Sequence, residues 1–191
     1  MSGDHQSPGF RDTIFAAIRL DESTARRAGE ITRRAYEEHG LEGKPRPLGN
    51  LHITVVYFGL HLSLGEEGIE KARRACAAAA ARLEPFEAQL YQLKSFAGRP
   101  WRPAPLVLVN AAKHAAFQDC YRTLFEAAQE LGLVQGRPPR FTPHVTIAYS
   151  SKQLAPQPIE PLVWQVTDLV LIHSFVGRTK YEELGRWGLG V

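Results

Sequence analysis

The sequence predicts an α+β fold with antiparallel strand pairing. Strand-like and helix-like segments alternate along the 191 residues, but without the even strand–helix beat that a doubly wound parallel sheet requires. Hydrophobic residues make up 44% and charged residues 23% of the chain, which is typical of a globular protein with a substantial core. We expect residues 1–10 to form a flexible N-terminal tail and residues 11–191 to fold as a single domain.

Two strands and two helices are expected in the first half. The strand segments are short runs of apolar, β-branched and aromatic residues bounded by polar residues or glycine. Asp21 provides an N-terminal capping residue for the first helix, and His39 with Gly40 provides a stop signal. Pro85 limits the second, alanine-rich helix. The expected elements are strand 13–18, helix 21–38, strand 51–58 and helix 66–83.

The second half continues the same mixture of elements. A stretch with three prolines must be a loop. An apolar stripe that includes Phe117 and Leu124 indicates a helix, with Gly132 as its cap. The expected order is strand 86–93, loop 95–105, strand 106–109, helix 115–131, loop 136–140, strand 144–149, one long or bent strand over 163–176, and a closing strand over 180–189.

Charge, cysteines and hydropathy limit the function classes. A net charge of +3 tolerates an anionic substrate without requiring one. Cys76 and Cys120 have no CxxC spacing, so we expect two buried thiols in a reducing compartment and no thiolate metal site. The N-terminus lacks a signal-peptide pattern, and no apolar run approaches the roughly 18 residues of a membrane span. We expect a cytoplasmic protein with no membrane association.

One sequence pattern occurs twice, once in each half. Residues 52–57 (HITVVY) and 144–149 (HVTIAY) share a histidine, a β-branched residue, threonine, a second β-branched residue, a small or branched apolar residue and tyrosine. A histidine two positions before serine also occurs at His5 and His61, but neither lies in an apolar strand. The longer repeated match within two strands is therefore the informative one.

Strand geometry gives this spacing its meaning. Side chains at positions i and i+2 of a strand point to the same face, so His52 projects beside Thr54 and His144 beside Thr146. The β-branched residues between and after them point to the opposite face, where they can pack against helices. If the two strands lie side by side, two imidazoles and two hydroxyls surround one point of about the size of a phosphate.

This set of side chains suits phosphodiester cleavage without a metal or cofactor. Histidine has a reference pKa of about 6.5 and can act as base or acid at neutral pH. A neutral imidazole can deprotonate water while an imidazolium protonates the departing alkoxide, and each role typically contributes about 10²–10⁴-fold. A single strand histidine is more often structural, but two matched motifs with co-facing threonines favour catalysis.

These residues resemble the 2H phosphoesterase superfamily, and within it the bacterial and archaeal RNA 2′,3′-cyclic phosphodiesterases, also called the 2′-5′ RNA ligase family. The resemblance covers most of the chain, from residues 15–18 to residues 181–189, and is closest at residues 51–54 followed by Phe58 and Gly59. It implies a single bilobal domain with two pseudo-symmetric lobes, antiparallel sheets lining a central cleft, and helices on the outside.

The resemblance also implies roles for the motif residues. His144 would be the general base, His52 the proton donor, and Thr54 and Thr146 the phosphate-binding residues. The reaction would hydrolyse a 2′,3′-cyclic phosphate at an RNA end to a 2′-phosphate. Members of the family commonly carry an arginine shortly after the second motif. If Tyr149 replaces that arginine in this chain, the phosphate contact would be weaker or would be supplied from elsewhere.

Basic and aromatic residues near the motifs are further candidates for substrate binding. Together they could hold a phosphate and stack a nucleobase, although a solvated loop explains them equally well. Lys44 and Arg46, before the first motif, are additional candidates for binding RNA. His173, in an apolar strand, could be structural or line the cleft. The substrate-binding candidates are Tyr57, Phe96, Arg99, Arg140, Phe141 and Tyr149.

Three other functions stay open from the sequence. The substrate could be a small cyclic phosphate, such as an ADP-ribose cyclic phosphate or a cyclic nucleotide. The chain could bind RNA ends without chemistry, although binding alone would not require a matched acid and base. The same site could also ligate a cyclic phosphate end to a 5′-hydroxyl through a 2′-5′ bond. The expected partner is RNA with a 2′,3′-cyclic phosphate end or a small cyclic phosphate, and we expect a monomer.

Overall fold

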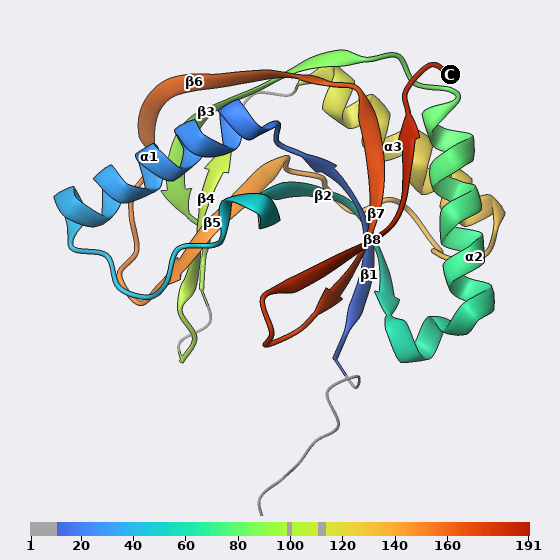
Figure 1. The fold of residues 1–191 in the computed structure, drawn as a ribbon, viewed down its shortest axis with the longest axis horizontal. Helices are drawn as coiled ribbons and strands as arrows, with labels where there is room; N and C mark the ends of the chain where they lie inside the picture. The colour runs from blue at the N-terminus through green and yellow to red at the C-terminus, as the bar shows by residue number, and fades with distance from the viewer. Residues whose placement is uncertain (1–10, 99–100, 111–113) are drawn as a thin grey trace, which may run out of the picture.

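The computed structural model describes residues 11–98, 101–110 and 114–191. Within these residues, eight strands pair antiparallel in the order β6-β3-β4-β5-β2-β1-β7-β8, with three α-helices packed beside them (Figure 1). The elements are β1 (Thr13–Arg19), α1 (Glu22–His39), the 3₁₀ turn η1 (Leu48–Asn50), β2 (His52–Leu60), α2 (His61–Ala80), β3 (Phe86–Ser95), β4 (Ala104–Val109), α3 (Ala115–Glu130), β5 (His144–Ser150), β6 (Gln157–Val166), β7 (Asp168–Phe175) and β8 (Lys180–Gly188).

The sheet consists of two four-stranded halves that meet at the strands of the repeated motif. One half has the order β6-β3-β4-β5 and the other β2-β1-β7-β8, so β5 and β2 are the two inner strands. The only residue pair that joins them in the described sheet is Ile53 with Val145. The α+β class, the antiparallel pairing and the two related halves are those expected from the sequence.

Both inner strands carry a β-bulge at the same place in the motif. Opposite β1, the pairing passes from Thr54 to Val56 and leaves Val55 as the extra residue. Opposite β4, it passes from Thr146 to Ala148 and leaves Ile147 as the extra residue. The first seven residues of β2 and β5 consequently have the same alternation of buried and exposed positions. The two halves are therefore pseudo-symmetric down to a local irregularity of the ladder.

The helices cover the two halves separately. Helix α1 packs against β5 and β6, whereas α2 and α3 pack on each other and against the other half, including β2 and β7. Figure 1 shows α1 beside one half and the α2–α3 pair beside the other. Asp21 caps α1 by accepting a hydrogen bond from the Thr24 N–H at 2.8 Å, and Gly40 ends the helix in the left-handed region at φ 56°, as predicted.

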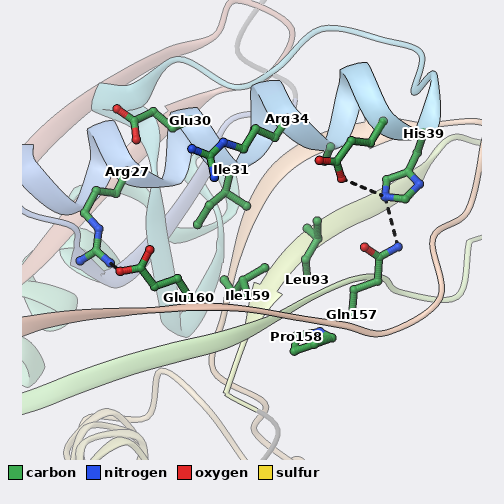
Figure 2. Close-up of a pocket in the computed structure, with 12 residues that line it drawn as sticks. Arg27, Glu30, Ile31, Arg34, His39, Leu93, Gln157, Pro158, Ile159 and Glu160 are labelled. Carbon is green, nitrogen blue, oxygen red and sulfur yellow. Dashed lines mark hydrogen bonds and ion pairs between the residues drawn. The ribbon is translucent and has the colours of Figure 1, made fainter.

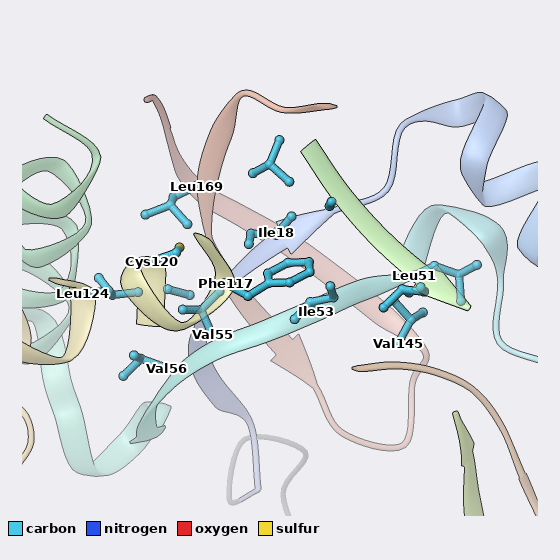
Figure 3. Close-up of a cluster of buried hydrophobic side chains, with 14 of the residues drawn as sticks. Ile18, Leu51, Ile53, Val55, Val56, Phe117, Cys120, Leu124, Val145 and Leu169 are labelled. Carbon is cyan, nitrogen blue, oxygen red and sulfur yellow. The ribbon is translucent and has the colours of Figure 1, made fainter. Parts of the chain in front are cut away.

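The main core lies between the helices and one face of the sheet. Figure 3 shows Phe117 and Leu124 of α3 beside Ile53 and Val55 of β2. Phe117 and Ile53 are fully buried, and burial of side chains of this size contributes roughly 1.5–3 kcal/mol each. Cys120, in the same cluster, and Cys76 are buried free thiols, as predicted. Burial raises the pKa of Cys120 to about 12, so neither a thiolate nor a metal site is favoured there.

The structure corrects the prediction of one long or bent strand over residues 163–176. The chain forms two strands, with a break at Thr167. β6 pairs with β3 at one edge of the sheet, whereas β7 pairs with β1 and β8 in the other half. Both segments are rich in strand-forming residues, but the C-terminal part of β6 is buried on alternate residues and β7 is buried almost throughout. Local pattern alone does not reveal that the two segments belong to opposite halves.

Smaller differences concern element ends. Helix α2 begins at His61, but Gly65 has a non-helical conformation (φ 60°), so the regular helix starts near the predicted residue 66. β4 begins at Ala104, which brings Pro105 into the strand opposite Tyr149 rather than into the preceding loop. No helix among the described residues is long and apolar enough to cross a membrane.

Candidate active site

The pairing of β2 with β5 brings the four motif side chains together. Because Ile53 pairs with Val145 in antiparallel direction, His52 lies across from Thr146 and Thr54 lies across from His144. Ile53 and Val145 are fully buried against the main core. The two histidines and two threonines therefore occupy the opposite face as a two-by-two array, and directly opposed side chains in such a ladder have Cβ atoms about 4.5–5.5 Å apart.

Both imidazoles are oriented by the same kind of hydrogen bond, to a backbone carbonyl two residues earlier in the chain. The Nδ1–H group of His52 donates to the carbonyl oxygen of Asn50 at 2.8 Å, and that of His144 donates to the carbonyl oxygen of Thr142 at 2.8 Å. Since a carbonyl only accepts, each neutral ring carries its proton on Nδ1 and leaves Nε2 for chemistry. The Nε2 atom of His52 lies 3.1 Å from the Thr54 hydroxyl, which completes a contact within the motif.

Aromatic side chains hold His52 and remove it from water. The Phe15 ring stacks on the imidazole with centroids 4.9 Å apart, and the Tyr181 ring meets it edge-on at 5.4 Å. This burial lowers the pKa of His52 to about 4, although the hydrogen bond to the Asn50 carbonyl opposes the change. The positive charge of Arg46 lowers the pKa further. His52 is therefore neutral at pH 7 in the free protein.

His144 has a similar but less enclosed environment. The Phe96 ring meets the imidazole edge-on, with centroids 4.8 Å apart. Burial lowers the pKa of His144 as well, and the hydrogen bond to the Thr142 carbonyl opposes this effect. Both motif histidines can therefore accept a proton at neutral pH, and a bound phosphate anion would favour the protonated form of whichever ring it contacts.

A cavity of about 470 Å³ opens over all four motif residues. We call it the polar cavity. Its walls come from β1, β2, β5, the loop before β2, and the ends of β7 and β8 with the turn between them. It is lined by Thr13, Phe15, Arg46, His52, Thr54, His144, Thr146, Tyr149, Ser174, Phe175, Val176, Gly177, Thr179 and Tyr181.

Arg46 reaches the polar cavity from the loop before the first motif. Its backbone N–H donates to the carbonyl oxygen of Ile147 at 2.8 Å, which fixes the loop to β5. Its guanidinium lies 5.6 Å from the centroid of the Tyr149 ring. Its Nε atom is buried without a hydrogen-bond partner in the part of the chain that the structure describes. A cation with one unpaired N–H is therefore present beside Tyr149, where the family resemblance leads us to expect an arginine.

Glycine allows the loop that carries Arg46 to lie against β5. Gly43 has φ 93°, a conformation that side chains with a Cβ rarely adopt, and a Cβ there would overlap the carbonyl oxygen of Tyr149. At the other end of the loop, the Asn50 side chain donates to the carbonyl oxygen of Thr179 at 2.9 Å. This loop thus links β5 to the β7–β8 turn across the mouth of the polar cavity.

A second cavity of about 490 Å³ adjoins the first. We call it the aromatic pocket. It shares Thr54 and His144 with the polar cavity but does not include His52. Four of the predicted substrate-binding residues meet there, and Tyr149 lines the polar cavity instead. The lining residues are Thr54, Val55, Val56, Tyr57, Phe96, Tyr121, Phe125, Pro139, Arg140, Phe141, Thr142 and His144.

Other candidates lie away from the motifs or outside the described chain. Arg99 falls outside the described residues. Lys44 is exposed and lines neither cavity. His173 is buried, stacks on His61 with centroids 4.2 Å apart, and lies 3.6 Å from the Asp12 carboxylate. It lines neither motif cavity, so these contacts favour a structural role. No group of three or more His, Cys, Asp or Glu side chains within residues 11–98, 101–110 and 114–191 is arranged to hold a metal ion.

A further pocket between α1 and β6 has none of the motif residues. Figure 2 shows two pairings among its polar side chains: Arg27 approaches Glu160 at 3.5 Å, and the Nε2 atom of His39 lies 3.2 Å from the Gln157 side-chain nitrogen. The volume of this pocket is about 240 Å³, half that of either motif cavity. We therefore place the candidate active site at the β2–β5 junction.

Several residues of the polar cavity had no distinctive signal in the sequence. Phe15 and Tyr181 belong to apolar or mixed strands, and Thr179 follows a short turn, so nothing in their local pattern indicates a site. Arg46 was the exception, because a basic residue shortly before the first motif was already a candidate for binding RNA. Only the sheet order, which sets β1 beside β2 and then β7 and β8 beyond β1, brings these side chains to the motif histidines.

Comparison with known proteins defines the class and then the family. The crystal structure of TT0787 of Thermus thermophilus matches with a TM-score of 0.73 and 23% identity, covering 93% of this chain and 98% of that one. Apo LigT of E. coli matches with a TM-score of 0.67 and 22% identity, covering 94% and 98%. A crystal structure described as a phosphoesterase gives 0.68 and 23%, covering 95% and 99%. The fold is therefore that of the LigT-like phosphoesterases.

The family follows from the sequence itself. The model of the 2′-5′ RNA ligase superfamily matches residues 20–176, which include both His-x-Thr motifs. The chain belongs to the 2′-5′ RNA ligase superfamily, a group of 2H phosphoesterases. No curated protein matches the sequence.

Proposed function

We propose that this protein is a metal-independent RNA 2′,3′-cyclic phosphodiesterase that hydrolyses a cyclic phosphate end to a 2′-phosphate. The observation that carries the proposal is the shared orientation of His52 and His144. Each ring donates its Nδ1–H to a backbone carbonyl two residues earlier, which leaves two Nε2 atoms for one cavity. A pair of this kind supplies a general base and a general acid without a metal.

The proposed reaction uses His144 as base and His52 as acid. Water gives its proton to Nε2 of His144 while its oxygen bonds to phosphorus. The bond from phosphorus to O3′ of the ribose breaks, and Nε2–H of protonated His52 gives its proton to O3′. The product carries a 2′-phosphate and a free 3′-hydroxyl. The assignment is supported by access, because His144 borders both cavities whereas His52 lies deeper, between Phe15 and Tyr181.

The remaining polar groups would stabilise the phosphate. The Thr54 and Thr146 hydroxyls can donate to the non-bridging oxygens, since each lies on the same face as a motif histidine. Arg46 brings a positive charge and a buried Nε–H without a partner among the described residues. Donors already aimed at the developing charge need no reorganisation during the reaction, which is the usual basis of electrostatic catalysis.

Three observations support a nucleotide as the substrate: the volume of the polar cavity, its aromatic lining, and the ligands of a protein with the same fold. The polar cavity has about 470 Å³ and includes the Tyr149 and Phe175 rings, which suits one nucleoside with its phosphate. E. coli LigT, which has the same fold, has been crystallised with 3′-AMP and with phosphate. A nucleotide with a phosphate at its 2′ and 3′ positions is accordingly the ligand class we assign to the polar cavity.

The test is turnover of an RNA that ends in a 2′,3′-cyclic phosphate, in the presence of EDTA. The wild-type protein should form the 2′-phosphate, whereas His52→Ala and His144→Ala should lose at least about 10²-fold in kcat/KM, the lower end of acid–base contributions. His39→Ala, a histidine of the α1–β6 pocket, is the matched control and should retain activity. Activity that survives both motif substitutions would remove the proposal.

Two other results would favour a different function, and a third would contradict metal independence. Turnover of adenosine 2′,3′-cyclic phosphate without turnover of the RNA end would favour a small cyclic phosphate as substrate. Binding of the RNA end without turnover of either substrate would favour the non-catalytic binding module. Loss of activity in EDTA that returns with a divalent cation would contradict metal independence.

A further inference from the structure

The polar cavity has a second polar end, remote from the motif histidines. Thr13 of β1 and Ser174 of β7 are partners in the ladder between these strands, and both line the cavity. Ile14 and His173, the next partners in this ladder, are buried on the opposite face. The hydroxyls of Thr13 and Ser174 therefore enter the cavity side by side, because directly opposed residues have Cβ atoms about 4.5–5.5 Å apart.

The protein itself does not use either hydroxyl. Both side chains are half-buried, and neither hydroxyl has a hydrogen-bond partner among residues 11–98, 101–110 and 114–191. Neither oxygen is fully buried, so both can be reached from the cavity. A serine or threonine hydroxyl supplies one donor and two acceptors and commonly bonds to nearby backbone. Thr13 and Ser174 instead offer these groups to a ligand.

The strand ends that carry the pair are held in place by Asp12, which is buried. Its carboxylate accepts a hydrogen bond from the Val176 N–H at 3.1 Å, and its backbone carbonyl accepts one from the His61 N–H at 2.7 Å. The first bond joins the start of β1 to the β7–β8 turn, and the second joins it to the start of α2. Polar groups on a fixed frame discriminate well between ligands, because little has to be ordered on binding.

The separation between this pair and the motif threonines matches the length of one nucleotide. Ala17 lies opposite Thr54 in the β1–β2 ladder, and Thr13 is four residues earlier on β1. At about 3.3 Å per residue, Thr13 and Thr54 are roughly 13 Å apart along the strand. A nucleotide whose phosphate lies at Thr54 and Thr146 therefore presents the outer edge of a purine to Thr13 and Ser174. A pyrimidine is shorter by one ring and leaves the two hydroxyls unpaired.

Between its two polar ends, the wall of the cavity is largely aromatic. It includes the rings of Phe15, Tyr149, Phe175 and Tyr181. Phe15 and Tyr181 contact His52, which leaves the other two rings for a base. Stacking tolerates any base, because every base has a π-face, so selection between bases has to come from contacts with the base edge.

We propose that Thr13 and Ser174 bind the outer edge of the terminal base and make the protein selective for a purine 2′,3′-cyclic phosphate end. This inference rests on the proposed function and deepens it, because it names the nucleotide at the end of the substrate. Adenine presents an amino donor beside a ring-nitrogen acceptor, and guanine presents a carbonyl acceptor beside a ring N–H. Two hydroxyls that can rotate match either arrangement. They determine specificity and take no part in the proton transfers.

The test compares terminal nucleotides in one assay. The substrates are the 2′,3′-cyclic phosphates of adenosine, guanosine, cytidine and uridine, and that of purine riboside, which has the two rings without a substituent at the outer edge. The wild-type protein should show about tenfold higher kcat/KM on the adenosine and guanosine substrates than on the pyrimidine substrates, in line with one or two neutral hydrogen bonds. Purine riboside should fall between them, because it keeps the ring nitrogen but lacks the amino group.

Removal of the hydroxyls should remove the selection. Thr13→Val and Ser174→Ala should each lower kcat/KM roughly three- to tenfold on the adenosine and guanosine substrates and change the pyrimidine values by less than about twofold. Thr13→Ser, which keeps the hydroxyl, should retain most of the selectivity. Thr167→Val, just before β7 and outside both motif cavities, is the control and should change none of the values. Thermal unfolding would verify that each variant is folded.

Failure of this inference is distinguishable from failure of the proposed function. Equal turnover of purine and pyrimidine substrates by the wild-type protein would overturn the inference alone. Equal losses on all substrates in Thr13→Val and Ser174→Ala would overturn it as well, since they would indicate a structural role. No turnover of any of these substrates, or of an RNA with the same end, would overturn the proposed function and, with it, the inference.

Discussion

At the scale of single residues, Arg46 is the side chain whose role depends most on tertiary contacts. It lies in the loop before the first motif but is held to the second by its backbone bond to Ile147. Its guanidinium lies over the Tyr149 ring, where the family resemblance leads us to expect an arginine. We therefore propose that the loop before the first motif supplies the charge expected from the second.

Replacement of Arg46 should affect both binding and titration. Arg46→Ala should reduce kcat/KM for a 2′,3′-cyclic phosphate roughly 10- to 100-fold, since charge-assisted hydrogen bonds contribute about 1.5–3 kcal/mol. The pKa of His52 should rise, because a positive charge that disfavours imidazolium is removed. Steady-state kinetics and an NMR titration of the histidines would measure the two effects. Lys44→Ala is the control, and an equal effect of both substitutions would contradict this role.

The pH dependence of activity follows from the environments of the two histidines. The mechanism needs protonated His52, whose pKa is lowered to about 4, and neutral His144, whose pKa is lowered from 6.5. Both titrations therefore lie below pH 6.5 in the free protein. We expect kcat/KM to reach its maximum below about pH 6.5 and to fall as the pH rises above it, because protonated His52 is lost. A profile of kcat/KM from about pH 4.5 to 9 with its maximum above about pH 7.5 would contradict the assignment.

At the scale of elements, the bulges in β2 and β5 determine where the motif tyrosines point. In a regular strand, position i+5 lies on the face opposite to position i, which would direct Tyr57 and Tyr149 into the core. The extra residues Val55 and Ile147 shift the alternation by one, so both tyrosines emerge on the face of the histidines. An irregularity of the ladder thus adds an aromatic side chain to each cavity.

The turn between β7 and β8 contains a second irregularity. Thr179 has φ 53°, the left-handed region in which a β-branched residue is strained by roughly 1–2 kcal/mol. Its carbonyl accepts a hydrogen bond from the Asn50 side chain, and the residue lines the polar cavity. Strain of this kind is retained when the surrounding contacts determine the conformation.

Thr179→Gly should therefore stabilise the protein. Glycine adopts this φ without a Cβ clash, and we expect the free energy of unfolding to increase by about 0.5–1 kcal/mol, reduced from the full strain by the greater flexibility of glycine in the unfolded chain. Urea denaturation would measure the change. Gly177→Ala, at φ 85° in the same turn, is the opposite control and should be destabilising. A loss of stability in Thr179→Gly would mean that the threonine side chain contributes more than its backbone strain costs.

At the scale of the whole molecule, the candidate site lies where the two halves of the sheet meet. Among the described residues, one ladder pair, Ile53 with Val145, joins them. This weak junction separates β2 from β5 on either side of Ile53 and Val145 and leaves room for cavities between the halves. The consequence is a set of titratable side chains held at low hydration in the middle of the fold. Stability and pH are coupled through these groups.

Acid should destabilise the protein through the buried histidines. The folded pKa of His52 is about 4 and its unfolded value is near 6.5, so the unfolded state binds more protons as the pH falls between these values. We expect His52 alone to cost about 2 kcal/mol of folding free energy between about pH 7 and pH 4.5. Denaturation at both pH values would show a smaller loss in His52→Gln than in the wild type. Equal losses would indicate that His52 is protonated readily in the folded state.

Most elements of the fold were predictable because their signals are local. Asp21 and Gly40 delimit α1, and the prolines and glycines delimit the loops, since these residues act on their own backbone. The division of residues 163–176 into β6 and β7 was not predicted, because both segments have strand-forming residues and their different sheet partners lie far away in the sequence. The same limitation applies to Phe15 and Tyr181, which belong to the site only because β1 and β8 lie in the half that contains His52.

The sequence by itself determined the set of side chains proposed to react. His52, Thr54, His144 and Thr146 follow from a two-residue period that every strand obeys, and the matched tyrosines mark the same repeat. Tertiary structure alone decided how these groups are used: the β2–β5 pair joins the motifs, the bulges turn the tyrosines outward, and Arg46 reaches the second motif. The physical reason is range, because side-chain alternation is a property of one strand, whereas register, bulges and loop contacts depend on segments far apart in the chain.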